Sequence, residues 1–131
     1  MKKMIIVSGA SKGLGNHICN RLRNLGHEVI GLSRDTSKLD FECYSCDISS
    51  YDELKKVAKE IRAKHKKANA IINAAGIASM NLALTTPPEV TERIIQTNLI
   101  GTIFCCQLLS PLLIKNNSGV IINFSTIAVP I

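Results

Sequence analysis

Short apolar runs rich in β-branched residues alternate along this chain with segments whose apolar positions recur at the helical period. The runs predict five strands, at Met4–Ser8, Glu28–Ser33, Glu42–Ser45, Ala70–Asn73 and Val120–Phe124. The periodic segments predict helices at Gly13–Leu25, Tyr51–His65 and, after two prolines, from about Glu89 to Ile114. Strands that alternate with helices are typical of an α/β fold with a parallel sheet and right-handed crossovers.

The connection between the second and third predicted strands is too short for a crossover helix. It runs only from Arg34 to Phe41 and is rich in Asp, Ser and Thr, so we predict a loop or a single turn. Only Ser125 to Ile131 follow the fifth strand. Because a parallel sheet needs cover on both faces, we expect the face that carries the first helix to be bare over the fourth and fifth strands.

Length and composition indicate one globular domain of 131 residues, 46% hydrophobic and 20% charged. Five cysteines, an odd number without a secretory context, favour a reducing compartment, and we interpret the protein as cytoplasmic. The longest apolar stretch, Leu99–Ile114, is interrupted by Gly101, Gln107 and Pro111. A buried core helix explains this stretch better than a membrane span.

A formal charge of +6 favours anionic partners without choosing among them. Much of this charge lies between Lys55 and Lys67, mostly on the predicted helix Tyr51–His65. No aromatic residue interleaves with these lysines, so a solvated helix face is favoured over a nucleic-acid patch. We therefore expect neither nucleic acid nor a membrane among the partners.

A glycine-rich turn joins the first predicted strand to the first helix. It reads Ser8-Gly9-Ala10-Ser11-Lys12-Gly13-Leu14-Gly15, which permits a tight turn, close approach to a pyrophosphate and packing of helix on strand. The free amides of the helix N-terminus would attract the negative charge. The spacing Gly-x-x-x-Gly-x-Gly differs from the usual Gly-x-Gly-x-x-Gly, and no Gly-Lys-Ser/Thr follows as in a Walker loop. A merely structural turn stays open as the alternative.

The second predicted strand ends in Ser33-Arg34, where an NAD-binding domain would carry an acidic residue for the adenosine ribose. A guanidinium and a hydroxyl at this point suit a 2′-phosphate. Lys12, in the glycine-rich turn, could add a second cation to the same phosphate. The pattern therefore predicts NADP(H) rather than NAD(H) as cofactor, with ordinary surface cations as the structural alternative.

Four further segments follow the glycine-rich turn in a recognisable order. They are Cys46-Asp47-Ile48, Asn73-Ala74-Ala75-Gly76, Thr97-Asn98-Leu99 and Ile121-Ile122-Asn123-Phe124-Ser125-Thr126. Together the five resemble the short-chain dehydrogenase/reductase family over essentially the whole chain, in the manner of the 3-oxoacyl-carrier-protein reductases. The resemblance implies a Rossmann-like, doubly wound parallel sheet in the strand order 3-2-1-4-5, truncated after the fifth strand, with residues 1–131 as the dinucleotide-binding domain. It also implies an NADP(H)-dependent oxidoreductase that transfers hydride between nicotinamide and a carbonyl or hydroxyl substrate.

Position by position, the resemblance implies a cofactor site and part of a catalytic site. The pyrophosphate and adenosine side would contact Gly9, Ser11, Lys12, Gly13, Leu14 and Gly15, and the 2′-phosphate would contact Ser33 and Arg34. Asp47, beside Ile48, would face the adenine amino group, and the adenine and ribose would lie along Asn73, Ala74, Ala75 and Gly76. Asn98 matches the active-site asparagine, whose backbone holds a water in a proton relay. The structural alternatives are a capping carboxylate at Asp47 and an amide at Asn98 bonded to a neighbouring segment.

The chain departs from the family pattern at the catalytic residues. Thr126 takes the position of the family's serine, with Ser125 as the weaker candidate. A threonine hydroxyl can donate the same hydrogen bond to a carbonyl, but its methyl group restricts the rotamer. The family's Tyr-x-x-x-Lys pair and substrate pocket lie beyond Ile131, so we expect little or no reaction from these residues alone. The pair Tyr51 and Lys55 has the spacing but lies in another helix.

Cysteines and histidines form no ligand set by their spacing. Cys43 and Cys46 have redox-motif spacing but lie on or beside a strand, where residues three apart point to opposite faces. The adjacent Cys105 and Cys106 and the scattered histidines add no ligand pattern, so we expect no metal site.

A truncated, non-catalytic dinucleotide-binding module, or a fragment that needs a partner to complete its sheet, is the alternative to the enzyme. The family usually forms dimers or tetramers through its long fourth helix and the next one, and only the first of these is present, so a homo-oligomer stays an option. The expected bare sheet face predicts that the 131-residue chain exposes apolar surface and associates.

Overall fold

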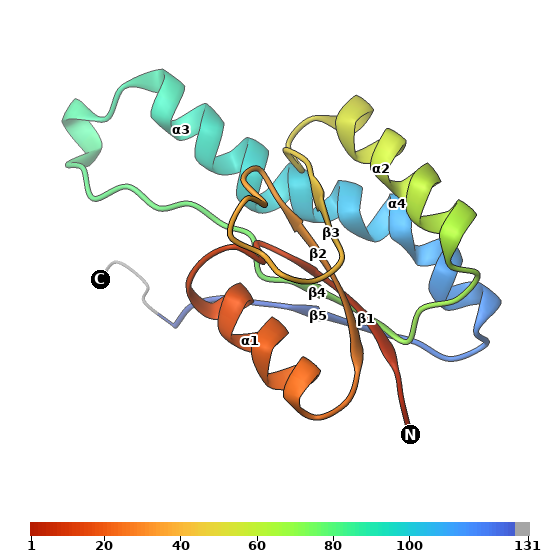
Figure 1. Ribbon diagram of the computed structural model, residues 1–131. Coiled ribbons are helices and arrows are strands. Elements are labelled where there is room, and N and C mark those ends of the chain that lie inside the picture. Colours follow the sequence, from red (N-terminus) through yellow and green to blue (C-terminus); the bar gives the residue numbers. More distant parts are fainter. Residues whose placement is uncertain (128–131) are drawn as a thin grey trace.

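Residues 1–127 are described by a computed structural model, in which five parallel strands form one sheet (Figure 1). The strands are β1 (Met4–Ser8), β2 (Glu28–Ser33), β3 (Cys43–Ser45), β4 (Ala70–Asn73) and β5 (Val120–Asn123). Their order across the sheet is β3-β2-β1-β4-β5, and every neighbouring pair is parallel. The predicted α/β class, the five strands and the order 3-2-1-4-5 are therefore confirmed.

Helices α1 (Gly13–Asn24), α2 (Tyr51–Lys64) and α4 (Thr102–Lys115) cover the two faces of this sheet. Helix α3 (Pro88–Ile95) has no buried residue and extends away from the sheet, after a 3-10 turn, η1 (Ala83–Thr85). Figure 1 shows α1 on one face and α2 with α4 on the other. The segment from Arg34 to Phe41 contains only bends and a turn, as predicted.

The long predicted helix is continuous but not uniform. A π-helical turn, η2 (Gln96–Gly101), separates α3 from α4. Gly101 packs so closely on Ile48 that a Cβ there would lie 2.9 Å from the Ile48 Cγ1. A one-residue widening of this kind leaves apolar periodicity nearly unchanged, so the sequence pattern does not reveal it.

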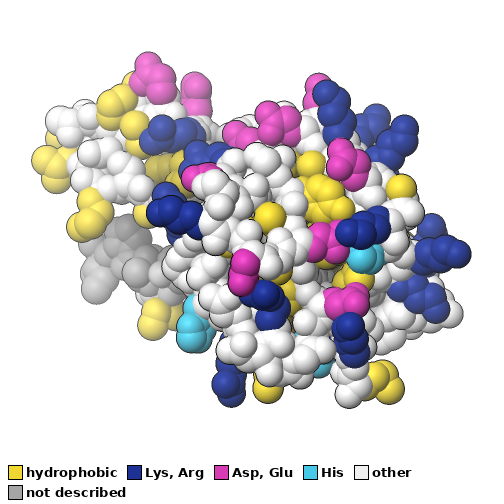
Figure 2. Space-filling view, viewed as in Figure 1, with side chains coloured by type: hydrophobic (Ala, Val, Ile, Leu, Met, Phe, Trp, Pro, Cys, Tyr) yellow, Lys and Arg dark blue, Asp and Glu magenta, His cyan; other side chains and the backbone are white. Residues whose placement is uncertain are grey.

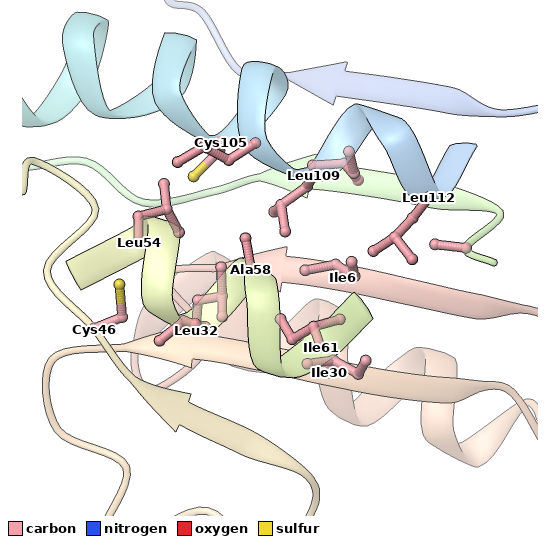
Figure 3. Close-up of a cluster of buried hydrophobic side chains, with 14 of the residues drawn as sticks. Ile6, Ile30, Leu32, Cys46, Leu54, Ala58, Ile61, Cys105, Leu109 and Leu112 are labelled. Atoms are coloured by element: carbon pink, nitrogen blue, oxygen red, sulfur yellow. The ribbon is translucent and has the colours of Figure 1, made fainter. Parts of the chain in front are cut away.

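The larger core lies between the sheet and the pair α2 and α4. Its fully buried side chains include Ile6 and Ile30 from the sheet, Leu54 and Ile61 from α2, and Leu109 and Leu112 from α4 (Figure 3). Each such aliphatic side chain contributes about 1.5–3 kcal/mol by leaving water. A smaller core under α1 joins Val7, Val29 and Ile72 to Cys19.

The run Pro88–Lys115 is long and apolar enough to cross a membrane by length and composition alone. In the fold, α4 packs against α2 and the sheet through Cys105, Leu109 and Leu112, as predicted for a core helix. Pro111 is accommodated inside α4. The Arg62 guanidinium of α2 donates to the Leu108 carbonyl of α4 at 3.1 Å and ties the two helices together.

The predicted bare face is correct for β5 and wrong for β4. Ile72 of β4 is only 7% exposed because it belongs to the core under α1. On β5, by contrast, Val120, Ile121 and Ile122 are 40–55% exposed, on both faces of the strand. The uncovered surface is therefore one edge strand rather than half a sheet.

Candidate functional site

A polar cavity lies where the carboxyl ends of β1, β2 and β4 meet. Its volume is about 160 Å³, and it is lined by Gly9, Ser11, Lys12, Leu32, Ser33, Arg34, Cys46, Asp47, Ile48, Ala74, Ala75, Gly76, Ile77 and Thr97. Ten of the fourteen predicted cofactor residues line it. The carboxyl ends of the strands are where open α/β sheets bind ligands, because the loops there diverge to either side of the sheet.

The glycine-rich turn packs against the end of β4 without room for side chains. A Cβ on Gly9 would lie 2.7 Å from the backbone of Ala75, and Gly9 has a φ of +71°. A Cβ on Gly15 would lie 2.1 Å from the Gly9 carbonyl oxygen. The Ala75 N–H donates to the Ser8 hydroxyl at 3.3 Å and links the β1 and β4 ends of the cavity. Only glycine fits these two places in the turn.

The N-terminus of α1 is open to a ligand. Lys12, the residue before the helix, makes no side-chain cap, and the first turn carries no acidic residue. A Cβ on Gly13 would meet nothing within 4 Å, so space remains beside the first amides. These amides and the helix dipole attract an anion. Three of the predicted residues lie in this same turn but outside the cavity lining: Gly13, Leu14 and Gly15. The Leu14 side chain is 52% exposed.

The end of β2 brings hydroxyl and cationic groups together. The Ser33 hydroxyl donates to the Ser11 hydroxyl at 2.6 Å and joins β2 to the glycine-rich turn. Arg34 and Lys12 line the cavity beside this pair. Among residues 1–127, no carboxylate lies within ion-pair distance of the Arg34 guanidinium. This corner of the cavity therefore carries two cationic side chains, neither of them in an ion pair with a described carboxylate, although Asp35 is near enough to interact electrostatically with Lys12.

Asp47 also lines the cavity, but it does not cap α2 as the structural alternative predicts, because the N-cap of that helix is Ser50. Its Oδ1 accepts from the Ser49 N–H at 3.0 Å and from the Ser49 hydroxyl at 2.6 Å. These bonds fix the half-buried carboxylate and leave Oδ2 as the atom that a ligand could meet. The local turn at Ser49 and a binding role of Asp47 are compatible in this geometry.

A second cavity, of about 210 Å³, lies between the ends of β4 and β5 and the π-helical turn. It is lined by Asn73, Ala74, Ala75, Gly76, Asn98, Thr102, Asn123 and Phe124. The buried Asn73 amide donates to the Asn123 Oδ1 at 2.8 Å and leaves its own Oδ1 without a partner among the described residues. Asn73, predicted beside the adenine, therefore lies under this cavity and not along the first one.

Asn98 is bonded to a neighbouring segment, as its structural alternative predicts. Its Oδ1 accepts from the Ile77 N–H and its Nδ2 donates to the Ile77 carbonyl, both at 2.8 Å. The Thr102 hydroxyl donates to the Asn98 backbone carbonyl at 2.8 Å. The side chain of Asn98 is thus used for structure, so only its backbone atoms could contact other partners.

Ser125 and Thr126 follow β5 at the same edge of the sheet, exposed and outside the lining of both cavities. Phe124, just before them, lines the second cavity. Tyr51 packs edge-on against Phe104 at 5.1 Å between ring centroids, so it belongs to the core between α2 and α4. The structure therefore separates the Tyr51 and Lys55 pair from this edge of the sheet.

Four lining residues were not predicted: Leu32, Cys46, Ile77 and Thr97. Each adjoins a predicted residue in the chain, which is the only sequence signal that could have found them. Burial raises the pKa of the Cys46 thiol to about 12, with Glu53 and Asp47 adding to the effect. Cys46 is therefore a neutral wall of the cavity at neutral pH. Within residues 1–127, no group of three or more His, Cys, Asp or Glu side chains could hold a metal ion.

Comparisons with known proteins agree with this architecture. The family model for short chain dehydrogenase matches residues 3–129. A 3-oxoacyl-[acyl-carrier-protein] reductase of Staphylococcus epidermidis is 29% identical, and the match covers 97% of this chain and 57% of the relative. The chain thus spans little more than half the length of this relative.

Two solved structures have closely similar folds. An aldohexose dehydrogenase from Thermoplasma acidophilum has a TM-score of 0.89 at 29% identity, over 95% of this chain and 49% of that one. A metagenomic short-chain oxidoreductase in complex with NADP also has a TM-score of 0.89, at 28% identity, over 98% of this chain and 64% of that one. Because the family model matches nearly the whole of this chain, the chain belongs to the short-chain dehydrogenase family.

Proposed function

We propose that this chain supplies the cofactor site of an NADP(H)-dependent oxidoreductase that transfers hydride between nicotinamide and a carbonyl or hydroxyl substrate. The observation that carries the proposal is the polar corner at the end of β2, where Arg34 and Lys12 flank the Ser33 and Ser11 hydroxyls. An arginine fork and hydroxyl donors suit the 2′-phosphate that distinguishes NADP(H) from NAD(H). NADP in the metagenomic relative is consistent with this choice.

The residues around the cavity fit a dinucleotide. The backbone of the glycine-rich turn packs directly on the end of β4, and the open N-terminus of α1 suits a pyrophosphate. Asp47 would accept from the adenine amino group through its Oδ2, since Oδ1 is already bonded to Ser49. Ala74, Ala75 and Gly76 offer a smooth backbone surface along the adenine and ribose.

Nicotinamide, when bound, would supply the hydride to a carbonyl substrate or accept it from a hydroxyl substrate. Among this chain's own residues, the hydroxyl of Thr126 would donate a hydrogen bond to the substrate oxygen, with Ser125 as the weaker candidate. The Asn98 backbone would hold a water of the proton relay, while its side chain keeps the segment at Ile77 in place. Within residues 1–127, no Tyr-x-x-x-Lys pair lies beside β5, so the proton donor of the reaction is not among them.

The five cysteines are all free thiols, which supports a reducing compartment, and we place the protein in the cytoplasm on this ground.

The α2 face that carries many of the lysines also carries acidic residues, as the mixed colours over α2 in Figure 2 show. This mixture supports a solvated helix face rather than a nucleic-acid surface.

The test is a titration of the purified chain with NADPH and NADH, followed by nicotinamide fluorescence. We expect the chain to bind NADPH more tightly than NADH. Arg34→Asp should weaken NADPH binding about 10- to 100-fold, because a charge-assisted contact is replaced by repulsion. NADH binding should change far less.

Lys38→Asp is the matched control, because Lys38 is exposed on the same loop but does not line the cavity. It makes the same change of charge and should leave the preference for NADPH intact. Equal loss in both variants would reduce the effect to long-range electrostatics. No binding of either dinucleotide to the unmodified chain would contradict the proposed function.

A further inference from the structure

A single side chain ties the loop that carries Arg34 to the neighbouring strand. The hydroxyl of Ser45, the last residue of β3, donates to the Arg34 backbone carbonyl at 2.8 Å. The register of β2 and β3 ends at the pair Ser33 and Ser45. The Cys46 N–H still donates to the Ser33 carbonyl at 2.8 Å. The Ser45 bond therefore holds the first residue beyond the paired part of β2.

The chain on both sides of Arg34 is fixed by other contacts. Before it, the hydroxyl bond between Ser33 and Ser11 spans 2.6 Å. After it, the Ser37 N–H donates to the Asp35 carboxylate at 2.9 Å and closes a tight turn. The Arg34 side chain itself is exposed, with no ion pair to a described carboxylate. The position from which its guanidinium extends thus depends on its backbone, and the Ser45 bond is what holds the Arg34 carbonyl.

We propose that Ser45 is a positioning residue for recognition of the 2′-phosphate. By holding the Arg34 backbone, it preorganises the guanidinium beside Ser33 and reduces the ordering cost of phosphate binding. Ser45 does not line the cavity, so it acts through Arg34 and not by contact with the ligand. The inference rests on the proposed function, since it takes Arg34 as the residue that binds the phosphate. A ligand without a 2′-phosphate gains nothing from Ser45.

Two small probes isolate this contribution: adenosine 2′,5′-bisphosphate and 5′-AMP, which differ only in the 2′-phosphate. Their binding to the chain and to Ser45→Ala, Ser45→Thr and Ser118→Ala is measured by calorimetry. Ser45→Ala should weaken the bisphosphate about three- to tenfold, the effect of one hydrogen bond, and change 5′-AMP binding less than about twofold. Ser45→Thr keeps the hydroxyl and should restore the preference. Ser118→Ala makes the same substitution at an exposed site outside the cavity lining and should behave as the unmodified chain.

Three results would overturn the role of Ser45. They are an unchanged affinity of Ser45→Ala for the bisphosphate, an equal weakening of both probes, and a Ser45→Thr variant as weak as Ser45→Ala. In each of these cases the unmodified chain still prefers the bisphosphate, and the NADP(H) preference stands. If the unmodified chain binds both probes equally, the NADP(H) preference fails, and the role of Ser45 fails with it.

Discussion

Two glycines with a left-handed backbone allow the conformational role of glycine to be distinguished from a role in ligand binding. Gly13, at the start of α1, has a φ of +51°, and Gly26, before β2, has a φ of +88°. A Cβ would meet nothing within 4 Å at either place. An added methyl group therefore strains the backbone at both positions without a clash. The two differ in surroundings, since only Gly13 lies beside the polar cavity.

We predict that Gly13→Ala and Gly26→Ala each lower the free energy of unfolding by about 1–2 kcal/mol, the cost of a left-handed backbone with a Cβ. Only Gly13→Ala should also weaken dinucleotide binding, because its methyl group enters the space above the α1 amides. Urea unfolding and NADPH titration of both variants check this. Equal effects on binding would mean that the space beside Gly13 is not used by the ligand.

At the scale of elements, the carboxylate of Glu42, just before β3, contacts residues at the end of α2. Glu42 accepts from the His65 ring at 3.0 Å and from the Lys64 ammonium at 3.1 Å, at the end of α2. The Tyr44 hydroxyl also donates to it, at 3.0 Å. Partial burial raises the pKa of the Glu42 carboxyl, but the bonds from His65, Lys64 and Tyr44 outweigh burial and hold the pKa below its usual value.

A lowered pKa in the folded state means that the unfolded chain binds the proton more readily. The contribution of Glu42 to stability is therefore present above the pKa of the unfolded state, about pH 4, and is lost as pH falls through the folded value. We predict that unfolding free energy declines over this range and that Glu42→Gln flattens the decline. Glu28→Gln, at an exposed ion pair with Lys2, should leave the profile unchanged. A Glu42→Gln profile identical to that of the unmodified chain would contradict this.

The elements show which parts of the structure the sequence could predict. Strand runs, helical periods and the short loop after Arg34 depend on local patterning, and their bounds agree with the structure to within a few residues. The π-helical turn and the side-chain bonds of Asn98 to Ile77 depend on contacts between distant segments. The cavity lining beyond the motifs, such as Thr97, depends on the same packing. Residue patterns carry no information on such contacts without the fold.

At the scale of the whole molecule, the apolar surface of β5 is the feature most at odds with a closed α/β unit. Val120, Ile121 and Ile122 stay 40–55% exposed on an edge strand. Parallel sheets are normally covered on both faces, and a flat apolar edge is a site of association.

We predict that the 131-residue chain associates as its concentration rises, as measured by light scattering, and that Ile122→Thr reduces this association. Leu25→Thr, at an exposed leucine that follows α1 and lies outside β5, should not. A monodisperse monomer at all concentrations would contradict the prediction.

The most direct test of the site is an amide-resolved NMR titration of the chain with NADP⁺. We predict that the largest shifts fall on Gly9, Gly13 and Arg34, because the pyrophosphate would meet the α1 amides and the 2′-phosphate the end of β2. Shifts confined to the lysines of α2, or no shifts at all, would mean that the chain has the family's fold without a dinucleotide site at this edge of the sheet.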